Sequence, residues 1–164
     1  MISKNDPLTP SPKGQIRVLF VCLGNICRSP MAEFIMKDII EKEGLSQGFL
    51  IESAATSFEE CGNSVYPPAV RELAKHGISC SGKRARTMTK SDYEKYDYII
   101  GMEDRNTSNI LRIIGSDPEN KVHKLMTFAG SDENIADPWY TGDFEGVFAQ
   151  ISAGCRGFLK SIDV

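Results

Sequence analysis

The sequence has little of what a chain needs to span a membrane, bind nucleic acid or hold a metal ion. No run of about 18 apolar residues occurs, so no membrane-spanning helix is predicted. A formal net charge of −3, from 19 basic and 22 acidic residues, is not typical of nucleic-acid binding. The two histidines, His76 and His123, lack metal-ligand spacing. We therefore expect no metal and no cofactor.

The cysteines and the N-terminal segment argue against a secreted protein held together by disulfides. Five cysteines are an odd number, and they have no regular spacing. The first 15 residues include Pro, Ser and Lys but lack the apolar core of a signal peptide. We expect residues 1–15 to be a flexible leader, residues 16–164 to form a single domain, and the protein to be cytoplasmic.

Alternating strand and helix patterns predict an α/β fold. Short apolar runs indicate strands at 16–21, 49–52, 98–101 and 122–125. Helical spacing and capping residues indicate helices from about 31 to 44, at 67–76, after Thr89, at 103–114 and after Asp143. Strands that alternate with helices favour a doubly wound parallel sheet flanked by helices, with the ligand site at the carboxyl ends of the strands.

The most informative motif is Cys-Leu-Gly-Asn-Ile-Cys-Arg-Ser-Pro at 22–30, directly after the first predicted strand. The backbone N–H groups of such a loop can curl inward to form a nest for an oxyanion, and the helix that follows adds positive potential. Gly24 and Asn25 tolerate the left-handed backbone that a nest needs. Ser29 is a good N-cap residue, and Pro30 is favoured at the first helical position.

The side chains of this loop indicate nucleophilic chemistry on a phosphate group. Arg28 can hold two phosphate oxygens in a fork. Cys22 would lie at the floor of the nest, where the positive field favours a thiolate that can attack phosphorus. A lone cysteine at a strand end is more often a small buried hydrophobic residue. The prediction therefore depends on the strand, loop and helix around it.

The segment Asp137-Pro138-Trp139-Tyr140 provides a second candidate group. Cleavage of a phosphate ester needs an acid that protonates the leaving oxygen, and Asp137 stands on a loop made rigid by Pro138. An aspartic acid, with an ordinary pKa of about 3.9, stays protonated near neutrality only where burial or negative charge raises that pKa. Trp139 and Tyr140 would wall the cleft and stack on an aromatic substrate. Asp-Pro is also a common turn former.

With both motifs in place, the sequence resembles the low-molecular-weight protein tyrosine phosphatases from about Ile16 to the C-terminus. The segments that match are 21–30, 53–57, 83–86, 97–102 and 137–140. The resemblance implies a phosphate loop after the first strand and a four-stranded parallel sheet in the order 2-1-3-4. It also implies hydrolysis of phosphotyrosine in a protein substrate, and of aryl phosphates, through a phosphocysteine intermediate.

The family's functional residues carry over by position. The resemblance implies that Cys22 is the nucleophile, Arg28 binds the phosphate, and Asp137 is the general acid and then the base. It implies that the phosphate-binding loop also includes Leu23, Gly24, Asn25, Ile26, Cys27 and Ser29. It implies that Ser53 supports this loop through a hydrogen bond to Asn25. The substrate cleft would consist of Trp139, Tyr140, Phe58 and Glu59. Ser29 would steady the thiolate. Cys27 would form a reversible disulfide with Cys22 under peroxide, or simply pack beneath the loop.

Two departures from the family pattern bear on the site. Lys83 stands where the family often has a histidine near the loop's supporting hydrogen bonds, which predicts an altered support. Glu59 stands where the family usually has an aromatic residue on the substrate-facing loop, with Phe58 one position earlier. Either Phe58 fills the aromatic role or this rim of the cleft is acidic.

Rival functions share the fold. Arsenate reductases of this type also use a Cys-x5-Arg loop, but they need a further pair of mid-chain cysteines, and residues 102–106 contain none. Protein arginine phosphatases have Thr where this chain has Ile26, whose apolar side chain suits an aryl phosphate better. A non-catalytic phosphotyrosine-binding or thiol redox-sensing module would keep the loop, yet Cys22 and Asp137 are both present. We expect a monomer or a weak homodimer.

Overall fold

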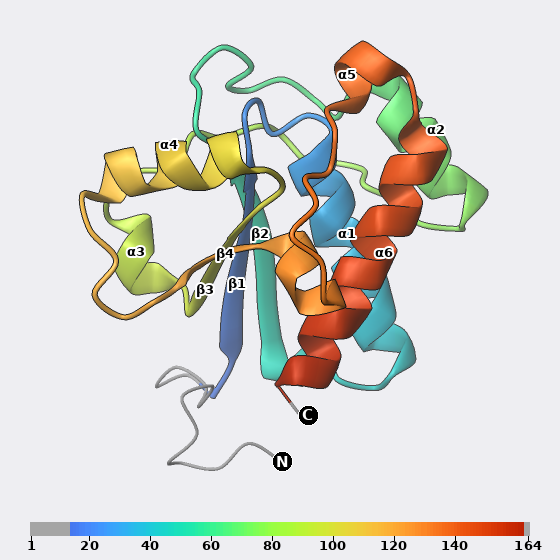
Figure 1. The fold of residues 1–164 in the computed structure, drawn as a ribbon. Coiled ribbons are helices and arrows are strands. Elements are labelled where there is room, and N and C mark those ends of the chain that lie inside the picture. The colour runs from blue at the N-terminus through green and yellow to red at the C-terminus, as the bar shows by residue number, and fades with distance from the viewer. Residues whose placement is uncertain (1–13, 163–164) are drawn as a thin grey trace.

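The computed structural model describes residues 14–162 (Figure 1). The predicted leader, residues 1–15, lies outside the described residues except for its last two. The described residues form a four-stranded parallel sheet in the order β2-β1-β3-β4, which confirms the predicted fold class and strand order. The strands are β1 (Ile16–Cys22), β2 (Phe49–Ala55), β3 (Tyr98–Gly101) and β4 (Val122–Lys124).

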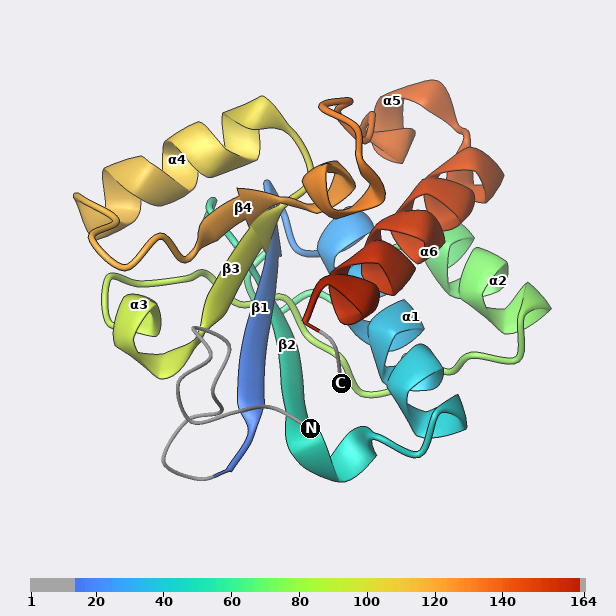
Figure 2. The ribbon, with the colours of Figure 1, turned by 60° about the horizontal axis from the view of Figure 1, so that its bottom comes forward.

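Helices cover both faces of this sheet (Figure 2). One face carries α1 (Arg28–Lys42), α2 (Pro67–Lys75) and α6 (Phe144–Ser161), and the other carries α3 (Asp92–Lys95) and α4 (Asp104–Ile114). Shorter turns complete the chain: η1 (Ser46–Gly48), η2 (Leu125–Ala129) and α5 (Pro138–Thr141). Within residues 14–162, every helix is too short or too polar to cross a bilayer.

Strand β1 is apolar from Val18 to Cys22, where both of its faces are covered. Val18 and Phe20 pack in the larger core, on the side of α1 and α6, whereas Leu19 and Val21 pack in the smaller core beside α4. A continuous apolar run is typical of a central parallel strand that is buried on both sides. Cys22 is the next residue on the larger-core face, so the strand delivers its sulfur to the interior at the carboxyl edge of the sheet.

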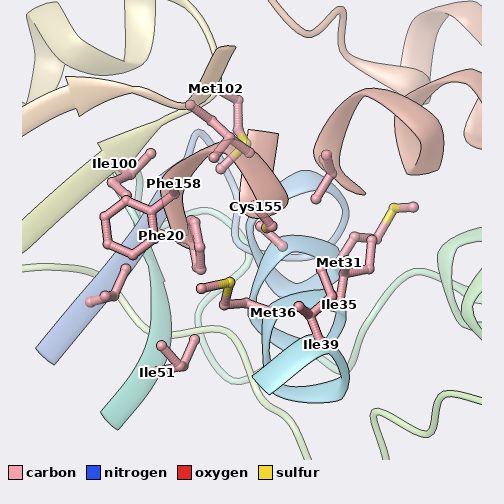
Figure 3. Close-up of a cluster of buried hydrophobic side chains, with 14 of the residues drawn as sticks. Phe20, Met31, Ile35, Met36, Ile39, Ile51, Ile100, Met102, Cys155 and Phe158 are labelled. Atoms are coloured by element: carbon pink, nitrogen blue, oxygen red, sulfur yellow. The ribbon is translucent and has the colours of Figure 1, made fainter. Parts of the chain in front are cut away.

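The larger core fixes α1 against the sheet. Figure 3 shows side chains from three sources: Phe20, Ile51 and Ile100 of the sheet; Met31, Ile35, Met36 and Ile39 of α1; and Cys155 and Phe158 of α6. Since α1 begins directly after the loop that follows β1, burial of its apolar face also positions that loop. The core therefore determines where the phosphate-loop motif lies.

The start of α1 differs from the prediction. The helix begins at Arg28 with Cys27 as its N-cap residue, so the prediction that Ser29 caps it and Pro30 opens it was wrong. Pro30 lies in the first helical turn, where a missing N–H removes no intrahelical hydrogen bond. The earlier start leaves the Ser29 hydroxyl available for another contact, with the sulfur of Cys22.

Helix α6 and η2 approach so closely that a glycine is needed between them. A Cβ atom built on Gly157 would lie 2.1 Å from the carbonyl oxygen of Phe128, which is backbone and cannot rotate away. One helical turn earlier, a Cβ on Gly154 would lie 2.5 Å from Cγ of Leu125. The contact brings the chain back from β4 onto α6 before it reaches Asp137.

We expect Gly157→Ala to lower the free energy of unfolding by about 2 kcal/mol, because the added methyl group must displace the η2 backbone. Helix propensity alone would give the opposite sign, a gain of about 1 kcal/mol. Urea denaturation measures the difference. The control is Ala153→Gly at an exposed position of the same helix, which should cost about 1 kcal/mol. A Gly157→Ala protein more stable than wild type would contradict the close approach.

Candidate active site

A cleft of about 200 Å³ lies at the carboxyl edge of the sheet. Three segments line it: the loop after β1, the segment after β2, and the start of α5, which lie at the same end of the molecule (Figure 1). The lining residues are Cys22, Leu23, Gly24, Ile26, Cys27, Arg28, Ser57, Glu59, Glu60, Asp137, Trp139 and Tyr140. The structure thus brings together the two motifs that the sequence singled out.

The loop between β1 and α1 points its carbonyl groups at neighbouring segments of the fold. The carbonyl oxygen of Leu23 accepts a hydrogen bond from the N–H of Ser57 at 3.0 Å, and that of Ile26 accepts one from Tyr66 at 2.9 Å. Asn25 adopts a φ of 60°, a left-handed conformation that asparagine reaches more readily than most residues. Carbonyl groups held outward turn the intervening N–H groups toward the inside of the loop, the arrangement of an anion nest.

The Cys22 sulfur lies at the base of the cleft within hydrogen-bond distance of two groups. The Ser29 hydroxyl oxygen is 3.0 Å away, and the backbone N–H of Asn25 donates to the sulfur at 3.3 Å. The Asn25 Nδ2 donates to Ser29 Oγ at 2.8 Å and to Ser53 Oγ at 2.9 Å, so the expected bond between Asn25 and Ser53 is present.

The Arg28 guanidinium is buried and is held by groups from two distant segments. Its Nη1 donates to Glu103 Oε2 at 2.5 Å and to the carbonyl oxygen of Ile135 at 2.8 Å. Its Nη2 lies 3.6 Å from Asp137 Oδ2. A buried cation needs such partners, because an unpaired charge in the interior is costly. Glu103 and Ile135 therefore fix the direction in which the guanidinium faces the cleft.

The contact between Glu103 and Arg28 is not among the predictions from the sequence, although a local signal for the position of Glu103 exists. Glu103 is the N-cap residue of α4 and forms a capping box with Asn106. It lies two residues after the end of β3, whose carboxyl end lies next to that of β1 in the sheet. A capping carboxylate at that edge is close enough to contact a guanidinium from the neighbouring loop.

The Asp137 carboxyl group is held in place by its role at the start of α5. Its Oδ1 accepts a hydrogen bond from the backbone N–H of Trp139 at 3.0 Å, and its Oδ2 is the oxygen that faces Arg28. The Trp139 ring packs on Tyr66, with ring centroids 4.6 Å apart. Tyr140, also on the cleft wall, is 81% exposed. The capped turn thus presents one carboxyl oxygen and two aromatic rings at the mouth of the cleft.

The wall of the cleft formed by the segment after β2 is acidic. Within residues 14–162, its lining includes Glu59 and Glu60 but not Phe58, which is 80% exposed. Of the two alternatives for this rim, the structure therefore places carboxylates on the cleft. Glu60 also packs closely on Gly24, where an added Cβ would lie 3.2 Å from the Glu60 Cγ atom.

The two histidines lie among side chains outside the cleft lining. The His76 ring stacks on Phe148 with centroids 3.6 Å apart, and its Nε2 is 3.2 Å from Glu72 Oε2. His123 lies on β4 beside Tyr98, and burial lowers its pKa. Over the described range, 14–162, no three His, Cys, Asp or Glu side chains gather as metal ligands would.

The thiols differ in their surroundings. Cys27 lies in the cleft, where burial and then the neighbouring charges of Cys22 and Asp137 raise its pKa to about 12. Burial likewise raises the pKa of Cys80 and of the fully buried Cys155. These three groups remain thiols near neutral pH, because the thiolate is the form that burial disfavours.

In the Cys22→Ser protein, we expect iodoacetamide at about pH 8 to alkylate Cys61 rapidly and the other three cysteines slowly, because the thiolate is the reactive form. Cys61 is exposed, whereas Cys27, Cys80 and Cys155 are buried. Peptide mass spectrometry of timed samples measures each rate. In denaturant all four should react at similar rates. Alkylation of Cys27 as fast as Cys61 in the folded protein would contradict its raised pKa.

Known proteins are similar to this chain over most of its length. The family model of low molecular weight phosphotyrosine protein phosphatases matches residues 17–164. The low molecular weight protein-tyrosine-phosphatase YfkJ of Bacillus subtilis is 38% identical over 149 residues, which cover 90% of this chain and 96% of that protein. The low molecular weight phosphotyrosine protein phosphatase of Sus scrofa is 38% identical over 151 residues, 88% of this chain and 94% of that protein.

Solved structures show the same similarity in three dimensions. The crystal structure of YfkJ from Bacillus subtilis has a TM-score of 0.87 and 39% identity, covering 90% of this chain and 94% of that chain. The crystal structure of DARP, drosophila arginine phosphatase, has a TM-score of 0.84 and 30% identity, covering 91% and 99%. The chain therefore belongs to the low molecular weight phosphotyrosine protein phosphatase family.

Proposed function

We propose that this protein hydrolyses phosphotyrosine in proteins, and aryl phosphates in general, through a phosphocysteine intermediate. The observation that carries the proposal is the meeting of three groups in one cleft: the Cys22 sulfur, the Arg28 guanidinium and the Asp137 carboxyl group. A nucleophile, an oxyanion-binding cation and a proton donor are the groups that such a displacement requires.

In the first step the Cys22 thiolate attacks phosphorus. Arg28 and the N–H groups of the loop hold the non-bridging phosphate oxygens, whose charge spreads in the transition state. The bond between phosphorus and the phenolic oxygen breaks as the sulfur–phosphorus bond forms. Asp137 gives its proton to the leaving oxygen, so that a neutral phenol departs.

In the second step water releases the phosphate. Asp137, now a carboxylate, takes a proton from a water molecule that attacks phosphorus from the side that the phenol left. The sulfur–phosphorus bond breaks and its electron pair returns to Cys22 as thiolate. The Ser29 hydroxyl, 3.0 Å from the sulfur, stabilises this leaving group as it stabilised the attacking one.

Cys27 takes part in a proposed protective reaction at the same site. Peroxide converts the Cys22 thiolate to a sulfenic acid; the Cys27 sulfur attacks that sulfur, and water leaves as the disulfide forms. Both residues line the cleft. A thiol reductant reverses the reaction by exchange.

We further propose a cytoplasmic enzyme that acts on phosphotyrosine-containing proteins as a monomer or weak homodimer, with neither nucleic acid nor a membrane as partner. All five cysteines of the sequence fall within the described residues, where they are free thiols. Free thiols suit a reducing compartment.

To test the chemistry, we expect wild-type protein to release p-nitrophenol from p-nitrophenyl phosphate in a reducing buffer with chelator. Cys22→Ser should lower kcat by at least about three orders of magnitude, because no second nucleophile is available. Asp137→Asn should lower kcat by about 100-fold. The loss should be larger with phenyl phosphate, whose leaving oxygen needs the proton more.

The control is Asp104→Asn, which removes an exposed carboxylate from the start of α4 and should leave kcat unchanged. Wild-type protein that binds a phosphotyrosine peptide without turnover would instead be a binding module.

A protein arginine phosphatase is the second candidate, supported by the similarity to drosophila arginine phosphatase. Ile26 on the cleft wall favours the aryl substrate, because an apolar side chain offers no partner to a guanidinium group. Paired peptides that differ only in phosphotyrosine or phosphoarginine separate the two functions by kcat/KM. A higher value for phosphoarginine would replace the tyrosine assignment.

The acidic rim predicts a sequence preference. We expect phosphotyrosine peptides with flanking Lys or Arg to have a kcat/KM about fivefold higher than peptides with flanking Asp or Glu, since Glu59 and Glu60 face the cleft. Glu59→Gln should reduce this ratio, and added salt should reduce it in wild type. Steady-state kinetics with matched peptides measures the ratio. Glu41→Gln, an exposed change on α1, should leave it unaltered.

A further inference from the structure

Lys83 is largely buried beneath the phosphate loop, in contact with two groups that support it. Its Nζ donates to the carbonyl oxygen of Ser53 at 2.9 Å and lies 3.3 Å from Glu33 Oε1. The Lys83 and Glu33 side chains are 12% and 5% exposed. We infer that Lys83, acting through Glu33, sets the direction of a chain of hydrogen bonds that ends at the Cys22 sulfur. Lys83 is thus a positioning residue for the proposed phosphatase reaction, on which this inference rests.

Glu33 determines which groups donate and which accept in this series of hydrogen bonds. An ionised carboxylate has no hydrogen to donate and can only accept. Its Oε1 lies 2.6 Å from the Ser53 hydroxyl oxygen, so the single hydrogen of that hydroxyl points to Glu33. The lone pairs of the Ser53 oxygen then face Asn25, whose Nδ2 donates to it at 2.9 Å.

The Asn25 amide transmits this direction to the nucleophile. Its Oδ1 accepts the backbone N–H of Arg86 at 3.1 Å, which fixes the side on which the NH2 group lies. One NH2 hydrogen goes to Ser53 and the other to Ser29 Oγ, at 2.8 Å. Since Ser29 accepts from Asn25, its own hydrogen is free to donate, and the Cys22 sulfur at 3.0 Å is a nearer acceptor than the carbonyl oxygen of Ala54 at 3.4 Å.

Lys83 keeps this chain from reversing, because it holds the carboxylate oxygen that accepts from Ser53. A carboxylate as buried as Glu33 needs cationic partners, because an unpaired charge in the interior is costly. Without Lys83, Oε1 loses the cation that holds it beside the Ser53 hydroxyl, and the hydroxyl hydrogen is then no longer held away from Asn25. A lysine ammonium is a donor only, so unlike a histidine ring it cannot accept from the chain that it supports.

A second lysine on the same carboxylate provides the matched control. Lys37 Nζ lies 2.6 Å from Glu33 Oε2, but its side chain is 43% exposed. An ion pair that is open to water contributes little. Lys83, by contrast, shares Oε1 with the Ser53 hydroxyl.

The test is the pH profile of Cys22 alkylation by iodoacetamide, read by peptide mass spectrometry without substrate. Lys83→Met should raise the pH at which Cys22 alkylation is half-maximal (the midpoint) by about half to one pH unit, because Ser29 no longer reliably donates to the thiolate. It should also lower kcat on p-nitrophenyl phosphate about tenfold with a smaller change in KM. Lys83→Arg should restore the wild-type midpoint, and Lys37→Met should leave it in place.

A second set of variants tests whether Ser53 belongs to the series of hydrogen bonds that connects Lys83 to Cys22. Ser53→Ala should raise the midpoint as Lys83→Met does, and the double variant should shift no further than either single one, since both changes break the same chain. The ionisable groups around Cys22 are unchanged in all of these proteins: Cys27, Arg28, Glu59, Glu60 and Asp137. If the midpoint shifts of the two single variants add up fully in the double variant, Lys83 does not act through Ser53.

If Lys83→Met folds poorly, the variant that combines it with Glu33→Gln also removes the buried negative charge, and it should show the same raised midpoint pH of alkylation. An unchanged midpoint with a lowered melting temperature would overturn the inference and leave Lys83 a structural residue. Because the midpoint is measured without substrate, it remains readable if wild type lacks phosphatase activity. Failure of the proposed function and failure of this inference are therefore distinguishable.

Discussion

The side-chain amide of Asn25 is the contact on which the rest of the site depends. It bridges the loop after β1 to the end of β2 through Ser53, to the first turn of α1 through Ser29, and to the backbone at Arg86. Asn25 is also the loop residue with left-handed backbone. Each of these polar groups is buried or partly buried, and leaving one unpaired costs about 1–3 kcal/mol. One residue therefore fixes both the shape of the loop and the hydroxyl beside the nucleophile.

The buried ion pairs of this protein orient side chains at the site more than they stabilise the fold. The pair of Arg28 with Glu103 and the pair of Lys83 with Glu33 each join segments that lie far apart in the sequence. Taking two charges out of water offsets much of their attraction, so such pairs are weak contributors to folding. What they supply is direction: the first aims a guanidinium at the cleft, and the second aims a hydroxyl hydrogen away from Asn25.

The floor and the rim of the cleft have different physical character. The floor, with Cys22 and Arg28, is almost fully buried and is held by hydrogen bonds and by the larger core. The rim, with Trp139 and Tyr140, is exposed and is free to meet a partner in solution. Chemistry that needs fixed distances thus lies on the rigid part of the fold, and contacts that select among substrates lie on its open edge.

Local signals explain what the sequence determined by itself. Four features depend on residues that are close together in the sequence, and the structure has each of them. They are the apolar run of β1, the alternation of strands and helices, the capping residue Asp143 before α6, and the phosphate-loop motif. The resemblance to the phosphatase family supplied the strand order and paired Asn25 with Ser53. The predicted start of α1 is wrong, because the Ser29 hydroxyl contacts a sulfur instead of capping the helix.

Only the tertiary structure decided which distant groups meet. Asp137 faces Arg28 and Glu103 anchors that guanidinium because the parallel sheet gathers the carboxyl ends of its strands at one edge. Lys83 pairs with Glu33 because the segment between α2 and α3 comes back to α1. Glu59 rather than Phe58 lines the cleft for the same kind of reason, the path of a loop after β2. A sequence specifies such contacts only through the packing of the whole chain, since no spacing along the backbone encodes a distance between segments that fold onto each other.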